Sequence, residues 1–169
     1  RLLNALLPRV LSAPTLDGLA YMKERRPDEY EAIEWLRRRV GGQPVLVEAS
    51  LEDYRYEYAR VSSNTGLPAV LGWWSHVDQR GYAHRDARRH DLSAFYESLD
   101  PAGLLAFIAK YDVGYVYVGD TERRMYTRGQ LRKFDEMAGI FEPVFRNRGA
   151  AIYRTVRDAR PPGKAAAGT

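Results

Sequence analysis

Short apolar runs that alternate with helical patterns constrain this chain more than any other feature. The runs at 44–50, 68–74 and 113–118 are rich in valine, leucine and aromatic residues, which predicts three buried strands. Helical patterns cover four segments between and after these runs: 27–40, 86–99, 101–111 and 121–139, the last interrupted at Gly129.

The end of the chain reads as a hairpin. Two apolar segments, 140–147 and 149–156, flank the turn sequence Asn147-Arg148-Gly149. Helices that alternate with buried strands predict an α/β fold. We expect a three-layer α/β/α sandwich, with a mostly parallel sheet of about five strands and a C-terminal antiparallel hairpin.

The length of 169 residues suits one domain with a hydrophobic core. We interpret residues 1–26, which prolines interrupt, as a leading segment, 27–157 as the α/β domain and 158–169 as a disordered tail. The chain begins with Arg1 instead of methionine, and we therefore expect it to be part of a longer protein.

Composition excludes several classes of protein. The chain has no cysteine, which rules out a disulfide scaffold and a cysteine-ligated zinc site. It has no apolar run of 18 residues or more, the length of a membrane span. Its net charge is +4, but aspartates at 78, 86 and 91 interrupt the arginines at 80, 85, 88 and 89, so we expect no nucleic-acid partner.

Candidate site residues follow the predicted strands. Ligands of α/β sheets bind beyond the carboxyl ends of strands, where Glu48, Trp73 to His76, and Gly119-Asp120 are expected to lie. Glu48 ends an apolar strand, so we expect it to be partly desolvated and paired with an arginine, for which Arg60 is the natural candidate. Successive strand residues face opposite ways, so only one of Trp73 and Trp74 should enter the core.

Metal binding is a weaker alternative. His76, Asp78 and His84 could ligate zinc or a harder ion, although no histidine pair has a helix or strand ligand spacing. The Ser-Ser-Asn-Thr-Gly stretch at 62–66 has no nucleophile-elbow pattern and is typical of a turn.

Several segments in order also match a known family. They read TLDGLAYM (15–22), PDEYEAIEWL (27–36), VLVEA (45–49), RVSSNTGLPAVLGW (60–73), RHDLSAFYES (89–98), KYDVGYVYVGDTERRMY (110–126) and AIYR (151–154). Together they resemble the C-terminal part of the YYY-type membrane proteins (Chlor_Arch_YYY) of bacteria and archaea. The resemblance extends from Thr15 to Val156, and one position departs from it: Val77 stands where the family loop has glutamate.

The family is similar to polytopic glycosyltransferases of the GT-C type, which use lipid-linked sugar donors. The resemblance implies a membrane region before Arg1, which anchors this domain on the extracytoplasmic face and is its partner. It implies that the catalytic carboxylate, and any divalent metal, belong to that region, so we expect neither a catalytic residue nor a cofactor here.

We therefore expect this domain to assist binding of a glycan acceptor or lipid-linked sugar, or to support the membrane region. The candidate ligand-binding residues form one predicted surface cluster: Glu48, Arg60, Thr65, Trp73, Trp74, His76, Gln79 and Arg80. The alternatives are a structural or interaction domain without a ligand and, less favoured, a soluble metal-dependent hydrolase using His76, Asp78 and His84.

Overall fold

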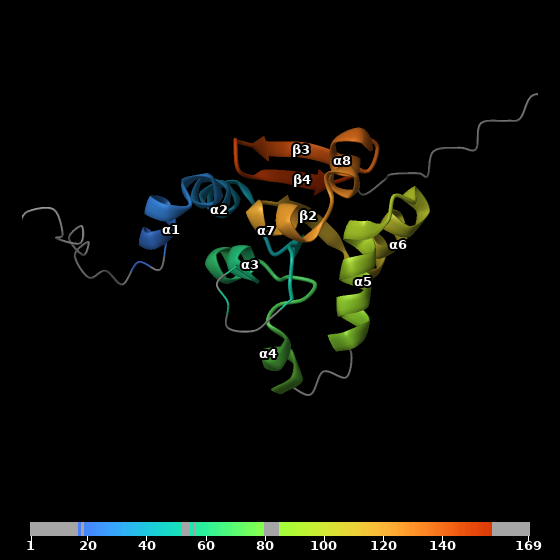
Figure 1. Ribbon diagram of the computed structural model, residues 1–169, viewed down its shortest axis with the longest axis horizontal. Coiled ribbons are helices and arrows are strands. Elements are labelled where there is room, and N and C mark those ends of the chain that lie inside the picture. The colour runs from blue at the N-terminus through green and yellow to red at the C-terminus, as the bar shows by residue number, and fades with distance from the viewer. Residues whose placement is uncertain (1–16, 18, 52–54, 56, 80–84, 157–169) are drawn as a thin grey trace, which may run out of the picture.

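The computed structural model describes residues 17, 19–51, 55, 57–79 and 85–156 (Figure 1). The predicted tail, Arg80, His84 and most of the leading segment lie outside the described residues. The described elements are α1 (Ala20–Arg25), α2 (Pro27–Arg39), β1 (Val45–Val47), α3 (Arg60–Thr65), α4 (Trp74–Gln79), α5 (Arg85–Glu97), α6 (Pro101–Tyr111), β2 (Val113–Val118), α7 (Asp120–Met125), α8 (Arg128–Glu136), β3 (Phe141–Arg146) and β4 (Ala151–Thr155).

The predicted α/β class is confirmed, but the predicted sheet is partly wrong. In the described part of the chain the sheet has four strands in the order β1-β2-β4-β3. Only β1 and β2 are parallel, whereas β4 pairs antiparallel with both β2 and β3. The sheet is therefore mixed, and the C-terminal hairpin supplies half of it.

The strand predicted at 68–74 does not form. Ala69 makes a single parallel bridge with Leu46, and Trp74 already begins α4. Pro68 has no N–H to donate to a ladder, and only its carbonyl is used, accepting from the Leu46 N–H at 2.8 Å. The segment thus lies beside β1 without extending the sheet.

Side chains that alternate along β2 enter two separate hydrophobic clusters. Val116 and Val118 pack with residues of α5, α6 and α8. Tyr117 packs with residues of α1, α2 and α3. Helices therefore cover both faces of the sheet, and Figure 1 shows α2 and α3 on one side of β2 with α5 and α6 on the other.

The hairpin turn is fastened to α2. The Asn147 carboxamide oxygen accepts from the N–H groups of Gly149 and Ala150, and its Nδ2 donates to the Asp28 carbonyl at 2.9 Å. A Cβ on Gly149 would lie 2.6 Å from the Asp28 side chain, so only glycine allows this close approach.

The predicted break of the last helix at Gly129 is misplaced. The helix ends at Met125, and α8 begins after Thr127. The Thr127 hydroxyl accepts from the Gln130 N–H while the Gln130 side chain accepts from the Thr127 N–H. This reciprocal capping box sets the N-cap of α8 at Thr127, two residues before the glycine.

No helix of the described residues is both long enough and apolar enough to cross a lipid bilayer.

A buried lysine on α8 caps the C-terminus of α5. Lys133 is 1% exposed, and its ammonium donates to the carbonyls of Phe95, Tyr96 and Ser98, the latter two at 2.7 Å. Burial lowers the pKa of Lys133 to about 8, so the group still carries charge at neutral pH. A cation here satisfies the free carbonyls at a helix C-terminus and complements its dipole.

Replacing Lys133 with methionine should lower the free energy of unfolding by about 2–3 kcal/mol, because buried carbonyls lose their donors. Lys110→Met is the matched control, since Lys110 is exposed and its solvent-screened ion pair with Asp91 should contribute little to stability. Urea denaturation measures both values, and equal losses in the two variants would contradict this role for Lys133.

Candidate functional site

Glu48, at the end of β1, is buried at 1% exposure and holds the start of α3. Its carboxylate accepts from the N–H of Val61 at 2.9 Å and from the N–H of Ser62 at 2.8 Å. Burial raises the pKa of Glu48, although nearby Arg60 and these hydrogen bonds act to lower it. The carboxylate therefore serves as an internal cap for α3.

Arg60 lies among three carboxylates at 2% exposure. Its Nε donates to Glu29 Oε1 at 3.1 Å and its Nη2 donates to Glu122 Oε2 at 2.8 Å. Its Nη1 donates to the Glu57 carbonyl at 2.9 Å and lies 4.0 Å from Glu48 Oε2. Arg60 is thus near Glu48, as predicted, but its shortest ion pairs are with glutamates that sequence reasoning did not select.

Glu122 connects the ends of both parallel strands. It accepts from the N–H of Ala49 at 2.8 Å and from the N–H of Gly119 at 2.7 Å, in addition to Arg60. Burial raises the pKa of Glu122, but Arg60 and the two backbone donors outweigh it, and the pKa is lowered. A Cβ on Gly119 would lie 2.8 Å from Arg60 Nη2, so the strand end must be glycine.

Glu29, Glu48, Arg60 and Glu122 are called the Arg60 cluster below. All four side chains are at most 5% exposed. Their hydrogen-bonding groups are directed to one another, to nearby backbone groups and, at Glu29, to the Arg26 guanidinium at 3.3 Å. The cluster therefore organises the carboxyl ends of β1 and β2 from inside and presents no charged group to a ligand.

A hollow of about 330 Å³ opens next to this cluster, between α3 and α4. It is called the Trp73 hollow, and its lining consists of small, hydroxyl-bearing and aromatic residues: Ala59, Ser62, Ser63, Gly72, Trp73, His76 and Val77. The Ser62 N–H is one of the two donors to Glu48, so the Arg60 cluster fixes one wall of the hollow.

Two aromatic rings in the hollow are held in place. Trp73 Nε1 donates to the Tyr58 carbonyl at 2.9 Å, and its ring meets His76 edge to face with a centroid distance of 5.3 Å. The partly exposed indole therefore offers a fixed flat surface, with an imidazole and two serine hydroxyls nearby. Such a combination suits a polar molecule with one apolar face, such as a sugar ring.

The other predicted site residues lie elsewhere. Trp74 packs against the hydrophobic cluster that includes Leu92 and Phe95 of α5, with the Arg89 guanidinium 5.1 Å from its ring centroid. As predicted, only one of the two tryptophans packs against the core, but the predicted strand on which that expectation rested does not form, since Trp74 begins α4. Thr65 donates to the Val61 carbonyl at 2.8 Å, and Gln79 is exposed at the end of α4.

The predicted metal ligands cannot be assembled from the described residues. His76 is exposed on α4, whereas His84 and the Asp78 side chain fall outside the description. Within the described ranges, no group of three histidine, aspartate or glutamate side chains is placed to hold a metal ion.

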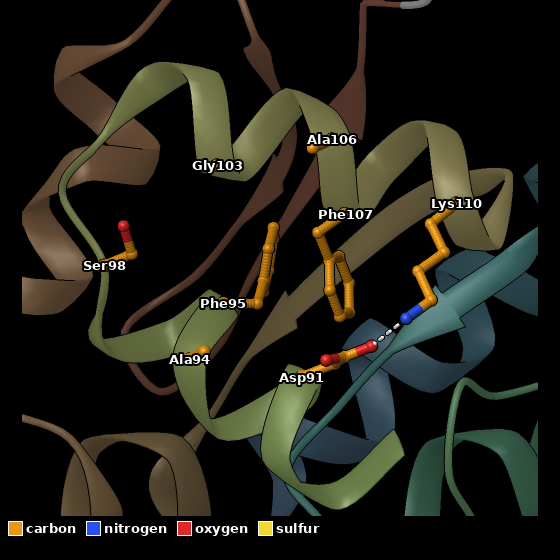
Figure 2. A pocket seen from close by; sticks show the side chains of 8 residues that line it. All are labelled: Asp91, Ala94, Phe95, Ser98, Gly103, Ala106, Phe107 and Lys110. Atoms are coloured by element: carbon orange, nitrogen blue, oxygen red, sulfur yellow. Dashed lines mark hydrogen bonds and ion pairs between the residues drawn. The ribbon is translucent and has the colours of Figure 1, made fainter. Parts of the chain in front are cut away.

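A second hollow, about 290 Å³, lies between α5 and α6 (Figure 2). Phe95 and Phe107 stack along it at 4.4 Å between centroids, and the ion pair of Asp91 with Lys110, at 2.6 Å, closes one end. Sequence reasoning missed this hollow. The sequence feature that could have indicated it is the spacing of small residues along the two helices. These are Ala94 in α5, Ser98 just after α5, and Gly103 and Ala106 in α6.

Comparison with models of protein families, with curated proteins and with solved structures found no match to this chain.

Replacing Arg60 with methionine should lower the free energy of unfolding by about 3–5 kcal/mol at neutral pH, because the buried carboxylates of Glu48 and Glu122 lose their counterion. Arg60 lowers the pKa of both Glu48 and Glu122, so its removal raises both values in the folded state. The folded variant then binds more protons than the unfolded chain, and its stability falls as pH rises above about 4.5.

Urea denaturation at pH 5 and pH 8 tests this, and the deficit of Arg60→Met relative to the unmodified protein should be larger at pH 8. Arg38→Met, which removes an exposed partner of Glu34, is the control with an expected loss below about 1 kcal/mol. A deficit that is independent of pH would contradict the electrostatic account.

Proposed function

We propose that this chain is the extracytoplasmic α/β domain of a polytopic, GT-C-like membrane glycosyltransferase that uses a lipid-linked sugar donor. In this proposal a membrane region preceding Arg1 anchors the domain and is its partner. The catalytic residue and any divalent metal belong to that region. The support is the ordered resemblance between Thr15 and Val156 described above.

Within that protein, the Trp73 hollow would bind part of the glycan acceptor or the lipid-linked sugar. The observation that carries this proposal is the fixed Trp73 indole, which lines the hollow together with His76 and two serines. The indole face would stack on the apolar face of a sugar, while the hydroxyls and imidazole would exchange hydrogen bonds with its hydroxyl groups.

The second candidate is a structural domain without a ligand of its own. It is favoured by the burial of Glu48 and Arg60, which are 1% and 2% exposed and bonded internally. These residues, proposed from sequence as ligand contacts, would then serve only to join α2, α3 and α7 to the sheet.

Titration of the ¹⁵N-labelled domain with a panel of oligosaccharides and sugar phosphates separates the two candidates. Binding in the Trp73 hollow predicts saturable shifts of the Trp73 indole N–H and of the His76 amide. Trp73→Ala should weaken binding about tenfold or more, because the stacking surface is lost.

Trp35→Ala is the matched control, since Trp35 is also partly buried but packs on Phe145 of the hairpin. His76→Ala provides a second variant on an exposed helical position, where loss of fold is not expected. If no compound of the panel shifts the signals of residues in the Trp73 hollow, the result favours a structural domain without a ligand.

The membrane part of the proposal has its own test. The coding sequence upstream of Arg1 should contain several apolar segments of about 20 residues. An upstream sequence without such segments would contradict the proposal, whatever the outcome of the sugar titration.

A further inference from the structure

Four arginines surround a third hollow, which shares no residue with the Trp73 hollow. It encloses about 430 Å³ beside the end of β2 at Val118. We call it the Arg123 hollow. Its charged lining comes from three elements: Arg123 of α7, Arg128, Arg132 and Asp135 of α8, and Arg146 of β3.

Two of these arginines already have acidic partners. Arg146 is paired with Asp135, and its Nη2 also donates to the Tyr153 hydroxyl at 2.9 Å. Arg132 is paired with Glu136, one turn further along α8. Asp135 in the hollow and Glu136 next to it are therefore already paired with arginines of the same surface.

The other two arginines have no carboxylate partner among the described residues. Arg123 donates to the Gly149 carbonyl, a neutral acceptor that holds its guanidinium at the hairpin turn. Arg128 lies at the first position of α8 and makes neither a hydrogen bond nor an ion pair within the described chain. The hollow thus has two positive charges, those of Arg123 and Arg128, that no carboxylate of the described residues neutralises.

We propose that the Arg123 hollow binds a phosphate-bearing anion, with a phosphoryl or pyrophosphoryl group placed between Arg123 and Arg128. Planar guanidinium groups bind phosphate oxygens in pairs, and two uncompensated charges match a phosphate dianion. The ion pair of Arg146 with Asp135 and Tyr153 forms a fixed wall, and the volume accommodates a pyrophosphate or a sugar phosphate.

Isothermal titration with inorganic pyrophosphate at low ionic strength tests the site directly. Saturable binding to the unmodified protein is expected, with an affinity at least about tenfold weaker in Arg123→Gln/Arg128→Gln. Arg128→Gln alone should also weaken binding, and it removes no internal contact, so a loss of fold cannot explain its effect.

Arg37→Gln/Arg38→Gln is the control for charge, because it removes two exposed arginines of α2, each paired with Glu34 at 2.9 Å. It should keep its affinity for pyrophosphate. An equal loss of pyrophosphate affinity in both double variants would overturn the proposal.

Vesicle sedimentation then identifies the source of the phosphate. Vesicles of phosphatidylcholine with phosphatidic acid are compared with vesicles of phosphatidylcholine alone. Binding to the acidic vesicles that requires Arg123 and Arg128 supports the site with a lipid headgroup as ligand, whereas pyrophosphate binding without vesicle binding supports it with a free phosphate. Binding to neither probe rejects the site, and none of these outcomes depends on the Trp73 hollow or on the proposed glycosyltransferase.

Discussion

The structure depends on the buried guanidinium of Arg60. It joins segments that are distant in sequence, since Glu29 comes from α2 and Glu122 from α7. A buried charge without partners would be very costly, so these segments have one arrangement that satisfies it. Through Glu122 the same cation reaches the backbone at Ala49 and Gly119, where the two parallel strands end.

Two adjacent residues of α7, Glu122 and Arg123, place their charges in different surroundings, one inside the protein and one at its surface. Glu122 points into the Arg60 cluster, where every carboxylate is shielded from solvent. Arg123 lines a surface hollow in which arginines outnumber the carboxylates that pair with them. The Trp73 hollow is different again, because the cluster supplies its rigid wall through Ser62 while its own lining is aromatic and hydroxyl-bearing. One ion network thus positions two surfaces of different chemistry.

Local patterns predicted much of the fold, and long-range pairing explains the errors. The helix beginning at Pro27 and the hairpin around Asn147 follow from proline, glycine and apolar spacing, and both form. The segment 68–74 resembles a strand locally, but it pairs with β1 only around Ala69, through hydrogen bonds of the Pro68 carbonyl and the Val70 N–H with Leu46, so it forms a single bridge. Desolvation of Glu48 correctly indicated a nearby arginine. Glu29 and Glu122 were missed because each is also a normal first-turn residue of its helix, and their distance from Arg60 in sequence leaves no local signal.

Amide hydrogen exchange is the most direct test of the claim that the Arg60 cluster organises the ends of the parallel strands. The N–H groups of Ala49, Val61 and Ser62 donate into buried carboxylates of the cluster. If the cluster is the central constraint, these amides exchange only through global unfolding, with opening free energies equal to the total stability. Opening free energies several kcal/mol below the total would show that this region opens independently, and would contradict the account.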